Sequence, residues 1–236
     1  MRTYRTTSGP FAERLFYTPK DIEVICIDEL RKVKLLPSSP EPVRVNRFIE
    51  KKFKIHLIFD DLPDGVIGCT EFGPDGVQGM IISKTLSEEG SKIAERRINT
   101  TLAHEAGHGL LHTHLFVLGQ NPESLFGKEF DSKKTKILCR NTAIQGLQGF
   151  NGTSNPWWEI QANLVIGPLL MPKALVLTAL EPFCIKKGRL GWQVPDRSLQ
   201  EEAVKALSEI FDVNPIVAKI RLESLFPPAQ DYQLTL

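Results

Sequence analysis

The chain has 236 residues, enough for one full domain with a small appendage, and its apolar (42%) and charged (24%) shares are ordinary for a globular protein. The 29 Lys and Arg residues nearly balance the 28 Asp and Glu residues, which argues against a nucleic acid as the main ligand. The four cysteines form no CxxC pair. Residues 1–16 lack the apolar core of a signal peptide. Prolines and a lysine interrupt the most apolar stretch, residues 164–180, which fits a membrane span poorly. We therefore expect a cytoplasmic protein that keeps its thiols reduced and does not enter a membrane.

The first part of the chain predicts two helices followed by a small sheet. Residues 20–36 alternate apolar and charged side chains at roughly helical spacing. Ser39 and Pro40 are typical of the N-cap and the first position of a second helix, which we expect to run to about Phe53. Runs rich in β-branched and aromatic residues follow, separated by turn signals, and they predict three strands of an antiparallel sheet: residues 54–59, 66–72 and 77–83.

The rest of the chain is mostly helical in pattern. Apolar residues recur every fourth position from about Ser91 to His112, which predicts a long helix. Residues 116–154 show weak periodicity, so a lid and a plain insertion both remain open. Asn155 and Pro156 indicate the start of another helix, which Gly167-Pro168 should kink or break. Two final helices, at 199–211 and 215–225, have the spacing of a helix-turn-helix unit.

The run His104-Glu105-Ala106-Gly107-His108 lies late in the long predicted helix. Residues four apart on an α-helix are one turn apart and about 40° apart around the axis, so His104 and His108 can both aim a ring nitrogen at one ion. Glu105 lies about 100° round from His104, where it can reach a water on that ion but not the ion itself. This arrangement is typical of hydrolysis with Glu105 as the general base. The plainer interpretation, two surface histidines, is disfavoured because this part of the helix is otherwise apolar.

A catalytic zinc needs a third protein ligand, and the sequence offers several. His114 has the metzincin spacing, but that arrangement requires a glycine where this chain has Leu111. Glu159 is the preferred candidate, because it lies in the first turn of a predicted helix and Asn163, one turn later, can orient a ligand. Three acids in the irregular stretch remain alternatives: Glu123, Glu129 and Asp131.

Two further features have a functional and a plainer interpretation. His112, one turn past His108, is a candidate for polarising a substrate carbonyl, but we prefer a surface histidine. Lys219 and Arg221 suit a DNA-binding helix, yet the neighbouring glutamates dilute their charge. We therefore prefer packing or the docking of a repressor for this last helical pair.

The segments TLAHEAGHGLLH (101–112), EIQAN (159–163) and LLMP (169–172) resemble, in this order, the ImmA/IrrE family of metallo-endopeptidases. The likeness covers about residues 21–180. It implies a zincin-like fold in which His104, His108 and Glu159 bind Zn2+, or another divalent ion such as Mn2+, and Glu105 is the general base. It also implies a protein substrate, because family members commonly cleave a helix-turn-helix repressor. The gap before Glu159 is longer than the family's, which marks residues 116–154 as an insertion.

These observations predict an α+β protein with two parts. A zincin-like peptidase domain with a small antiparallel sheet is expected over residues 19–182, and a helical, helix-turn-helix-like segment over residues 195–226. The predicted function is zinc-dependent hydrolysis of a peptide bond in a protein. The rival interpretation is a catalytically silent regulator that binds a repressor or DNA.

Overall fold

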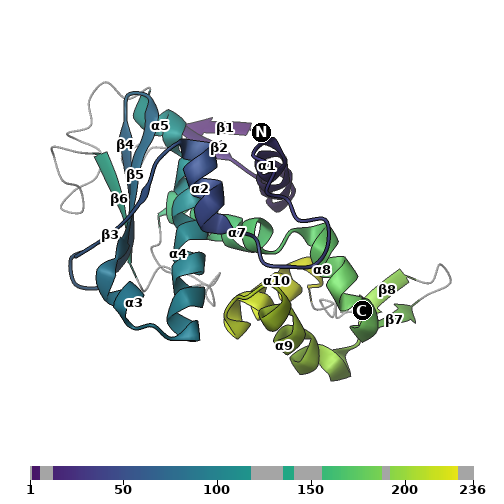
Figure 1. The fold of residues 1–236 in the computed structure, drawn as a ribbon. Helices are drawn as coiled ribbons and strands as arrows, with labels where there is room; N and C mark the ends of the chain where they lie inside the picture. The colour runs from purple at the N-terminus through teal and green to yellow at the C-terminus, as the bar shows by residue number, and fades with distance from the viewer. Residues whose placement is uncertain (1, 6–12, 118–134, 141–155, 188–191, 228–236) are drawn as a thin grey trace, which may run out of the picture.

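A four-stranded sheet and several helices surround a shared hydrophobic core, which confirms the expected α+β class. The computed structural model describes residues 2–5, 13–117, 135–140, 156–187 and 192–227 (Figure 1). The strands of the main sheet are β3 (Leu57–Asp60), β4 (Val66–Gly73), β5 (Gly76–Ser83) and β6 (Thr135–Arg140). Two small hairpins lie outside it: β1 (Arg2–Arg5) with β2 (Glu13–Phe16), and β7 (Cys184–Lys187) with β8 (Trp192–Pro195).

The main sheet has the order β3-β5-β4-β6. Strand β4 is antiparallel to both of its neighbours, whereas β3 is parallel to β5. The expected purely antiparallel, three-stranded sheet was therefore wrong in two respects. Strand β3 pairs with the far side of β5, and β6 adds a fourth strand from the stretch with no clear periodicity. Local alternation predicts that a segment is extended, but its neighbour in the sheet is set by contacts distant in sequence.

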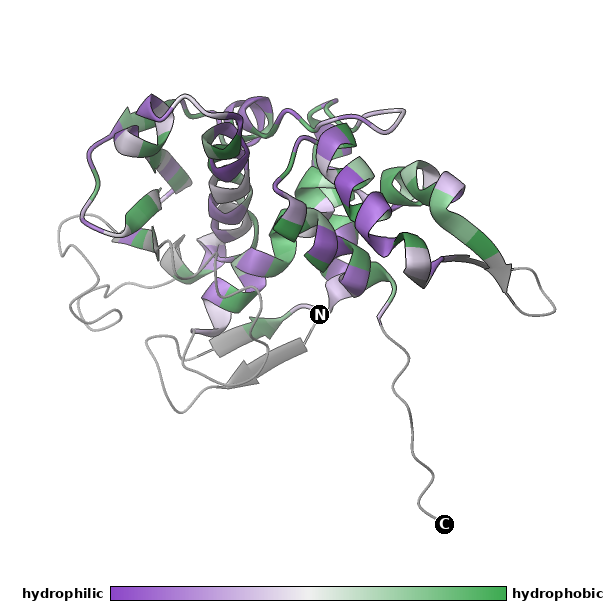
Figure 2. Cartoon of the chain, turned by 90° about the horizontal axis from the view of Figure 1, so that it is seen from below, coloured by the Kyte–Doolittle hydropathy of each residue, from purple (hydrophilic) through white to green (hydrophobic). Residues whose placement is uncertain are grey.

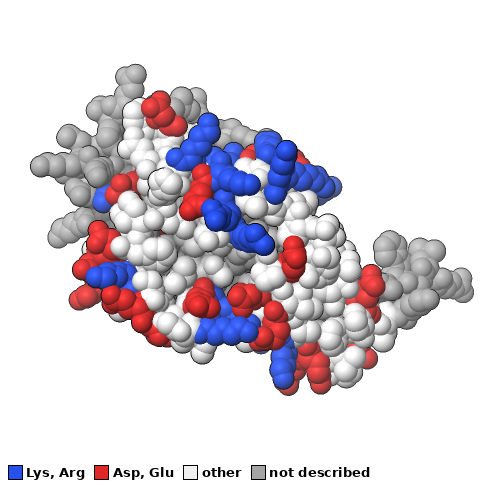
Figure 3. Space-filling view, viewed as in Figure 1, with Lys and Arg blue, Asp and Glu red and all other residues white. Residues whose placement is uncertain are grey.

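The two N-terminal helices are α1 (Pro19–Lys32) and α2 (Val45–Phe53). A capping box fixes the start of α1, since Thr18 and Asp21 each accept a hydrogen bond from the other's backbone. The start expected for α2 at Pro40 was wrong. Pro42 disfavours the helical conformation for the residue before it, so the segment from Ser39 onwards stays non-helical until Val45. On the face drawn in Figure 3, Lys and Arg side chains gather over these two helices.

The long helix α4 (Lys92–Leu111) lies between the sheet and α7 (Trp157–Leu170) (Figure 1). Its expected bounds are confirmed: the side chain of Ser91 caps it by accepting a hydrogen bond from Ala94, and His112 ends it. Because partners lie on both sides, almost every residue of its second half is buried. A short helix on each side completes this region: α3 (Lys84–Glu88) and α5 (Thr113–Val117).

Of the expected kink or break at Gly167-Pro168, the break does not occur, because α7 continues through both residues. Pro168 removes a helical hydrogen bond, but the flanking side chains of Val165, Ile166 and Leu169 are buried in the core and compensate for it. The chain bends instead before α8 (Lys173–Leu180). Among the described residues, no single helix has the length and hydropathy of a membrane span. Helix α7 and residues 173–183 reach that length and hydropathy only together, and the two segments are bent by 54° relative to each other.

The expected C-terminal helical pair is confirmed and packs on the core formed by the earlier helices. Arg221 is 4% exposed; its guanidinium pairs with Glu23 at 2.7 Å and donates to the carbonyl of Met171 at 3.0 Å. It therefore anchors the pair to α1 and is not available to read DNA. Figure 2 shows hydrophobic residues, in green, and hydrophilic residues, in purple, along the helices. The remaining elements are two 3-10 turns (Glu181–Phe183 and Arg197–Leu199), α9 (Gln200–Ile210) and α10 (Pro215–Leu225).

Candidate metal centre

Helix α4 brings two imidazoles together, and α7 brings a carboxylate to them. The Nε2 atoms of His104 and His108 are 3.0 Å apart, and each lies close to Glu159: His104 is 3.2 Å from Oε2 and His108 is 3.4 Å from Oε1. In a tetrahedral zinc site with bonds of about 2.0–2.1 Å, two ligand atoms are about 3.3 Å apart. The three residues expected to bind the metal therefore lie at the separations that one ion requires.

Buried polar atoms without partners support this assignment. Oε1 of Glu105 and Oε2 of Glu159 have no hydrogen-bond partner, although the latter lies near His104. His104, Glu105 and His108 are 0% exposed and Glu159 is 8% exposed, so bulk solvent does not reach these atoms, and a buried oxygen without a partner costs free energy. A divalent cation between the two rings and Glu159 would satisfy that carboxylate, and the donor set of two imidazoles and one carboxylate is one that zinc commonly uses.

Asn163 orients His104, the first candidate ligand. Its Oδ1 atom accepts a hydrogen bond from Nδ1 of His104 at 2.8 Å, which leaves the Nε2 lone pair directed towards Glu159 and His108. The expectation that Asn163 would orient a ligand from one turn along the helix is confirmed. Because Glu159 and Asn163 lie on the same face of α7, a single helix supplies both a ligand and the support for another.

His112 orients His108, the second candidate ligand. It does so through a chain of hydrogen bonds, and the backbone carbonyl at the far end of the chain fixes the direction of each bond. The backbone carbonyl oxygen of Leu15 can only accept a hydrogen bond, and the side-chain amide nitrogen of Gln161 donates one to it at 2.8 Å. The carbonyl oxygen of Gln161 therefore accepts from Nε2 of His112 at 3.1 Å. Nδ1 of a neutral His112 must then accept from Nδ1 of His108, 3.0 Å away, which leaves the Nε2 lone pair of His108 for a metal.

The surface location expected for His112 was therefore wrong. Its ring is 0% exposed, and Trp157 packs against it edge-on with ring centroids 5.7 Å apart. Both ring nitrogens are engaged, so His112 is not placed to polarise a substrate carbonyl either. The regular spacing of His104, His108 and His112 was the available signal, because residues four apart lie on one face of a helix. Gln161 carried no signal of its own.

Strand β4 shapes the surroundings of Glu105. The hydroxyl of Thr70 donates a short hydrogen bond to Oε2 of Glu105. A Cβ at Gly68 would lie 2.7 Å from Oε1 of Glu105 and 2.6 Å from Thr101, so only glycine leaves room for the carboxylate. Sequence patterns identified neither residue, because both belong to a strand that meets α4 only in the folded chain.

Burial and neighbouring charges shift the pKa values in the metal-free site. Burial raises the pKa of Glu105 to about 7. Burial alone would lower the pKa of His104, but Cys139 and Glu159 hold it well above its usual value. Burial would raise the pKa of Glu159, but the two imidazoles, His108 foremost, bring it well below its usual range. In the metal-free site the two imidazoles therefore stabilise the ionised form of the Glu159 carboxylate.

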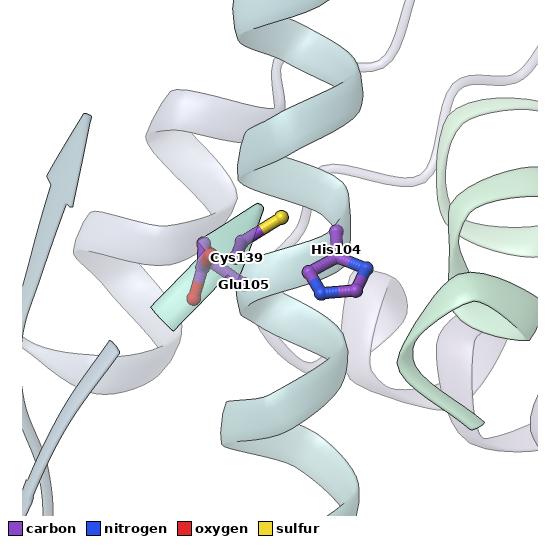
Figure 4. Close-up of side chains that lie close together, drawn as sticks. All are labelled: His104, Glu105 and Cys139. Carbon is purple, nitrogen blue, oxygen red and sulfur yellow. The ribbon is translucent and has the colours of Figure 1, made fainter. Parts of the chain in front are cut away.

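A cysteine that no motif indicated lies beside the same site. The sulfur of Cys139 forms a second group with His104 and Glu105, in which the three ligand atoms lie within 4.8 Å of one another. Figure 4 shows Cys139 on β6, next to the turn of α4 that carries the other two residues. Sequence reasoning missed it because it lies in a stretch without periodicity and has no cysteine or histidine nearby in sequence.

The alternative third ligands are not brought to this centre. His114 lies in α5, half-buried, and belongs to neither of the two groups of candidate ligands found in the described part of the chain. The other three alternatives, Glu123, Glu129 and Asp131, lie outside the described residues. Among the candidates that the structure describes, only Glu159 lies near both histidines.

Comparison with known proteins assigns no family to this chain. No protein-family model matches the sequence, and no curated protein matches it at a significant level. The resemblance to ImmA/IrrE peptidases therefore stays an expectation, and the function has to be inferred from the site.

Proposed function

We propose that this protein is a zincin-like, metal-dependent endopeptidase that cleaves a peptide bond in a protein. It would hold Zn2+, or another divalent ion such as Mn2+, with His104, His108 and Glu159. One observation carries the proposal: three buried ligand atoms from two helices converge beside a second carboxylate, that of Glu105, which is not needed to hold the ion.

A divalent ion held here would supply Lewis acidity, polarising a substrate carbonyl and making a water more acidic. Glu105 would take the proton from the attacking water and give it to the leaving amine. Its two oxygens are suited to different tasks. The Thr70 hydroxyl donates to Oε2, which leaves Oε1 as the oxygen that would accept the proton.

The surrounding residues keep the ligands in place and keep bulk water out. Asn163 and His112 fix the ring orientation of the two histidines, so little conformational freedom is lost when the ion binds. Burial strengthens electrostatic interactions inside the site, because the effective dielectric constant is lower than in water. In the metal-free protein burial raises the pKa of Glu105 to about 7, which supports a role for this carboxylate in accepting and releasing a proton near neutral pH.

The substrate class and location belong to the same proposal. The resemblance of residues 101–112, 159–163 and 169–172 to ImmA/IrrE peptidases supports a helix-turn-helix repressor as the substrate. All four cysteines carry thiols, which fits the reducing cytoplasm.

Substitution of Glu105 by Gln tests the proposal against a silent regulator. Zinc-loaded wild-type protein and Glu105→Gln are compared in two assays, zinc content and cleavage of fluorophore-labelled casein. We expect Glu105→Gln to keep its zinc and to lose cleavage. The matched control is Glu95→Gln, an exposed carboxylate on the same helix, which should behave as the wild type. Equal cleavage by wild type and Glu105→Gln would exclude a peptidase that uses this base.

A further inference from the structure

Strand β3 forms one edge of the main sheet, and β6, which lies beside the candidate metal centre, forms the other (Figure 1). One side of β3 pairs with β5. In the part of the chain that the structure describes, no strand pairs with its other side. The backbone N–H and C=O groups on that side are therefore open to a strand from another molecule.

The side chains at this edge are apolar although they are exposed. Ile58 is 48% exposed and Phe59 is 45% exposed. Successive residues of a strand point to opposite faces of the sheet, so apolar surface is exposed on both faces at this edge. Edge strands that stay unpaired commonly carry a lysine or a proline, and β3 contains neither. Its only charged residue is the last one, Asp60, so the middle of the strand has no side chain that opposes pairing.

The polar residues on either side of this apolar run differ in charge. Lys54 and His56 precede the run, and Asp60 and Asp61 follow it; all four residues are exposed. When two copies of a strand pair antiparallel, the beginning of each copy lies beside the end of the other. The basic beginning of one copy then lies beside the acidic end of the second copy, and twofold symmetry repeats this attraction at both ends of the pair.

An antiparallel pairing centred on Ile58 also brings the apolar side chains together. Ile58 then faces Ile58 of the second copy, and Leu57 faces Phe59 of the second copy. The same register places His56 opposite Asp60 of the second copy. A parallel pairing would instead place like charges beside each other at both ends of the strand, so the charge pattern favours the antiparallel arrangement.

We propose that the protein forms a homodimer in which the β3 strands of two copies pair antiparallel and join the two main sheets into one. The interface is self-complementary, because the same strand supplies both of its sides. Strand β3 contributes none of the three residues proposed to hold the ion, so the dimer forms with or without a metal. The inference therefore goes beyond the proposed function and does not depend on it.

Sedimentation velocity of the full chain tests the dimer. The wild type should sediment as a dimer at about 100 µM and dissociate on dilution. Ile58→Lys should be monomeric, because it places two like charges opposite each other at the centre of the pair, and Phe59→Lys should be monomeric for lack of apolar contact. The matched control is Ile93→Lys, which should dimerise as the wild type does, since Ile93 is 64% exposed but lies on α4, where the backbone offers no edge. A monomeric wild type, or a dimer that survives in either β3 variant, would overturn the proposal.

Charge reversal tests the antiparallel direction. Lys54→Asp leaves acidic residues at both ends of the run, and the double variant Asp60→Lys/Asp61→Lys leaves basic residues at both ends. Aspartate is tolerated at position 54, because it readily adopts the left-handed conformation of that residue. Each of these two variants should dimerise about 10-fold more weakly than the wild type. The chain that combines all three substitutions should regain wild-type affinity, since its two ends again carry opposite charges. A combined variant that dimerises no better than its two parents would contradict antiparallel pairing.

Discussion

His108 donates a hydrogen bond from its Nδ1 atom to the Nδ1 atom of His112, 3.0 Å away and one turn later on α4. The contact joins a proposed metal ligand to a side chain that Gln161 holds from α7, and Gln161 is in turn tied to the backbone at Leu15. The orientation of one imidazole therefore depends on two further segments of the chain. Such supporting hydrogen bonds fix both the tautomer and the direction of a ligand.

Substitution of His112 by Ala should lower zinc affinity about 10- to 100-fold, because Nδ1 of His108 loses its acceptor and the ring can rotate. Competition with a chromogenic chelator measures the change. The control is His56→Ala, which removes an exposed histidine away from the site. An unchanged zinc affinity in His112→Ala would show that the ring of His108 is held by packing alone.

Gly107 sets the distance between α4 and α7. A Cβ there would lie 2.9 Å from the carbonyl oxygen of Ala162, which is backbone, so Gly107→Ala should push α7 and its Glu159 away from the histidines. We expect weaker zinc binding and a loss of about 1–3 kcal/mol in the free energy of unfolding.

The control for this prediction is Gly109→Ala on the same helix. Its Cβ would meet the end of the Phe53 side chain at 2.6 Å, and that ring can move. This variant should lose stability but keep its zinc affinity. If both variants bind zinc as the wild type does, close approach of the helices is not what places Glu159.

The parts of the site that lie within one helix could be predicted from the sequence. Helical periodicity alone places His104 and His108 on one face, and the same rule puts Asn163 one turn after Glu159. The caps at Thr18 and Ser91 are also set locally, and α1 and α4 both begin within one residue of the expected positions, Lys20 and Ser91.

The parts of the fold and of the site that depend on contacts between distant segments could not be predicted from the sequence. The pairing of β3 with β5, the strand β6 and the approach of Cys139 to α4 follow from sheet register, which no local pattern encodes. His112 looked like a surface residue because a histidine is usually exposed or intermediate, yet here α7 covers it. Gly68 is required only because a carboxylate from another element lies against it.

In the metal-free protein, Glu105→Gln should increase stability at high pH. Burial raises the pKa of the folded Glu105 carboxyl from 4.5 to about 7. The folded state therefore holds this proton more tightly than the unfolded state, and the stability it contributes is fully present below pH 4.5 and is lost as the pH rises to about 7. Gln does not titrate, so the variant should gain about 3 kcal/mol over wild type above pH 7.

Urea unfolding of both metal-free proteins at pH 5 and pH 8 measures this difference. Glu95→Gln again serves as the control, because it changes an exposed carboxyl on the same helix. A stability difference that stays the same at the two pH values would mean that Glu105 does not titrate with a raised pKa.

Arg221→Met should destabilise the protein by about 3 kcal/mol, because it leaves the carboxylate of Glu23 without its buried partner. Adding Glu23→Leu should recover part of the loss, since a buried ion pair can be replaced by apolar side chains at little cost. Thermal unfolding of the two variants measures both effects. A loss below about 0.5 kcal/mol for Arg221→Met would mean that this pair does not anchor the C-terminal helices.

The metal content of the purified chain tests the central claim most directly. Inductively coupled plasma mass spectrometry is applied to wild type, Glu159→Ala and His114→Ala. We predict one divalent ion per chain in wild type and in His114→Ala, and none in Glu159→Ala. A wild type without a stoichiometric ion, or a Glu159→Ala variant that retains it, would contradict the proposed site.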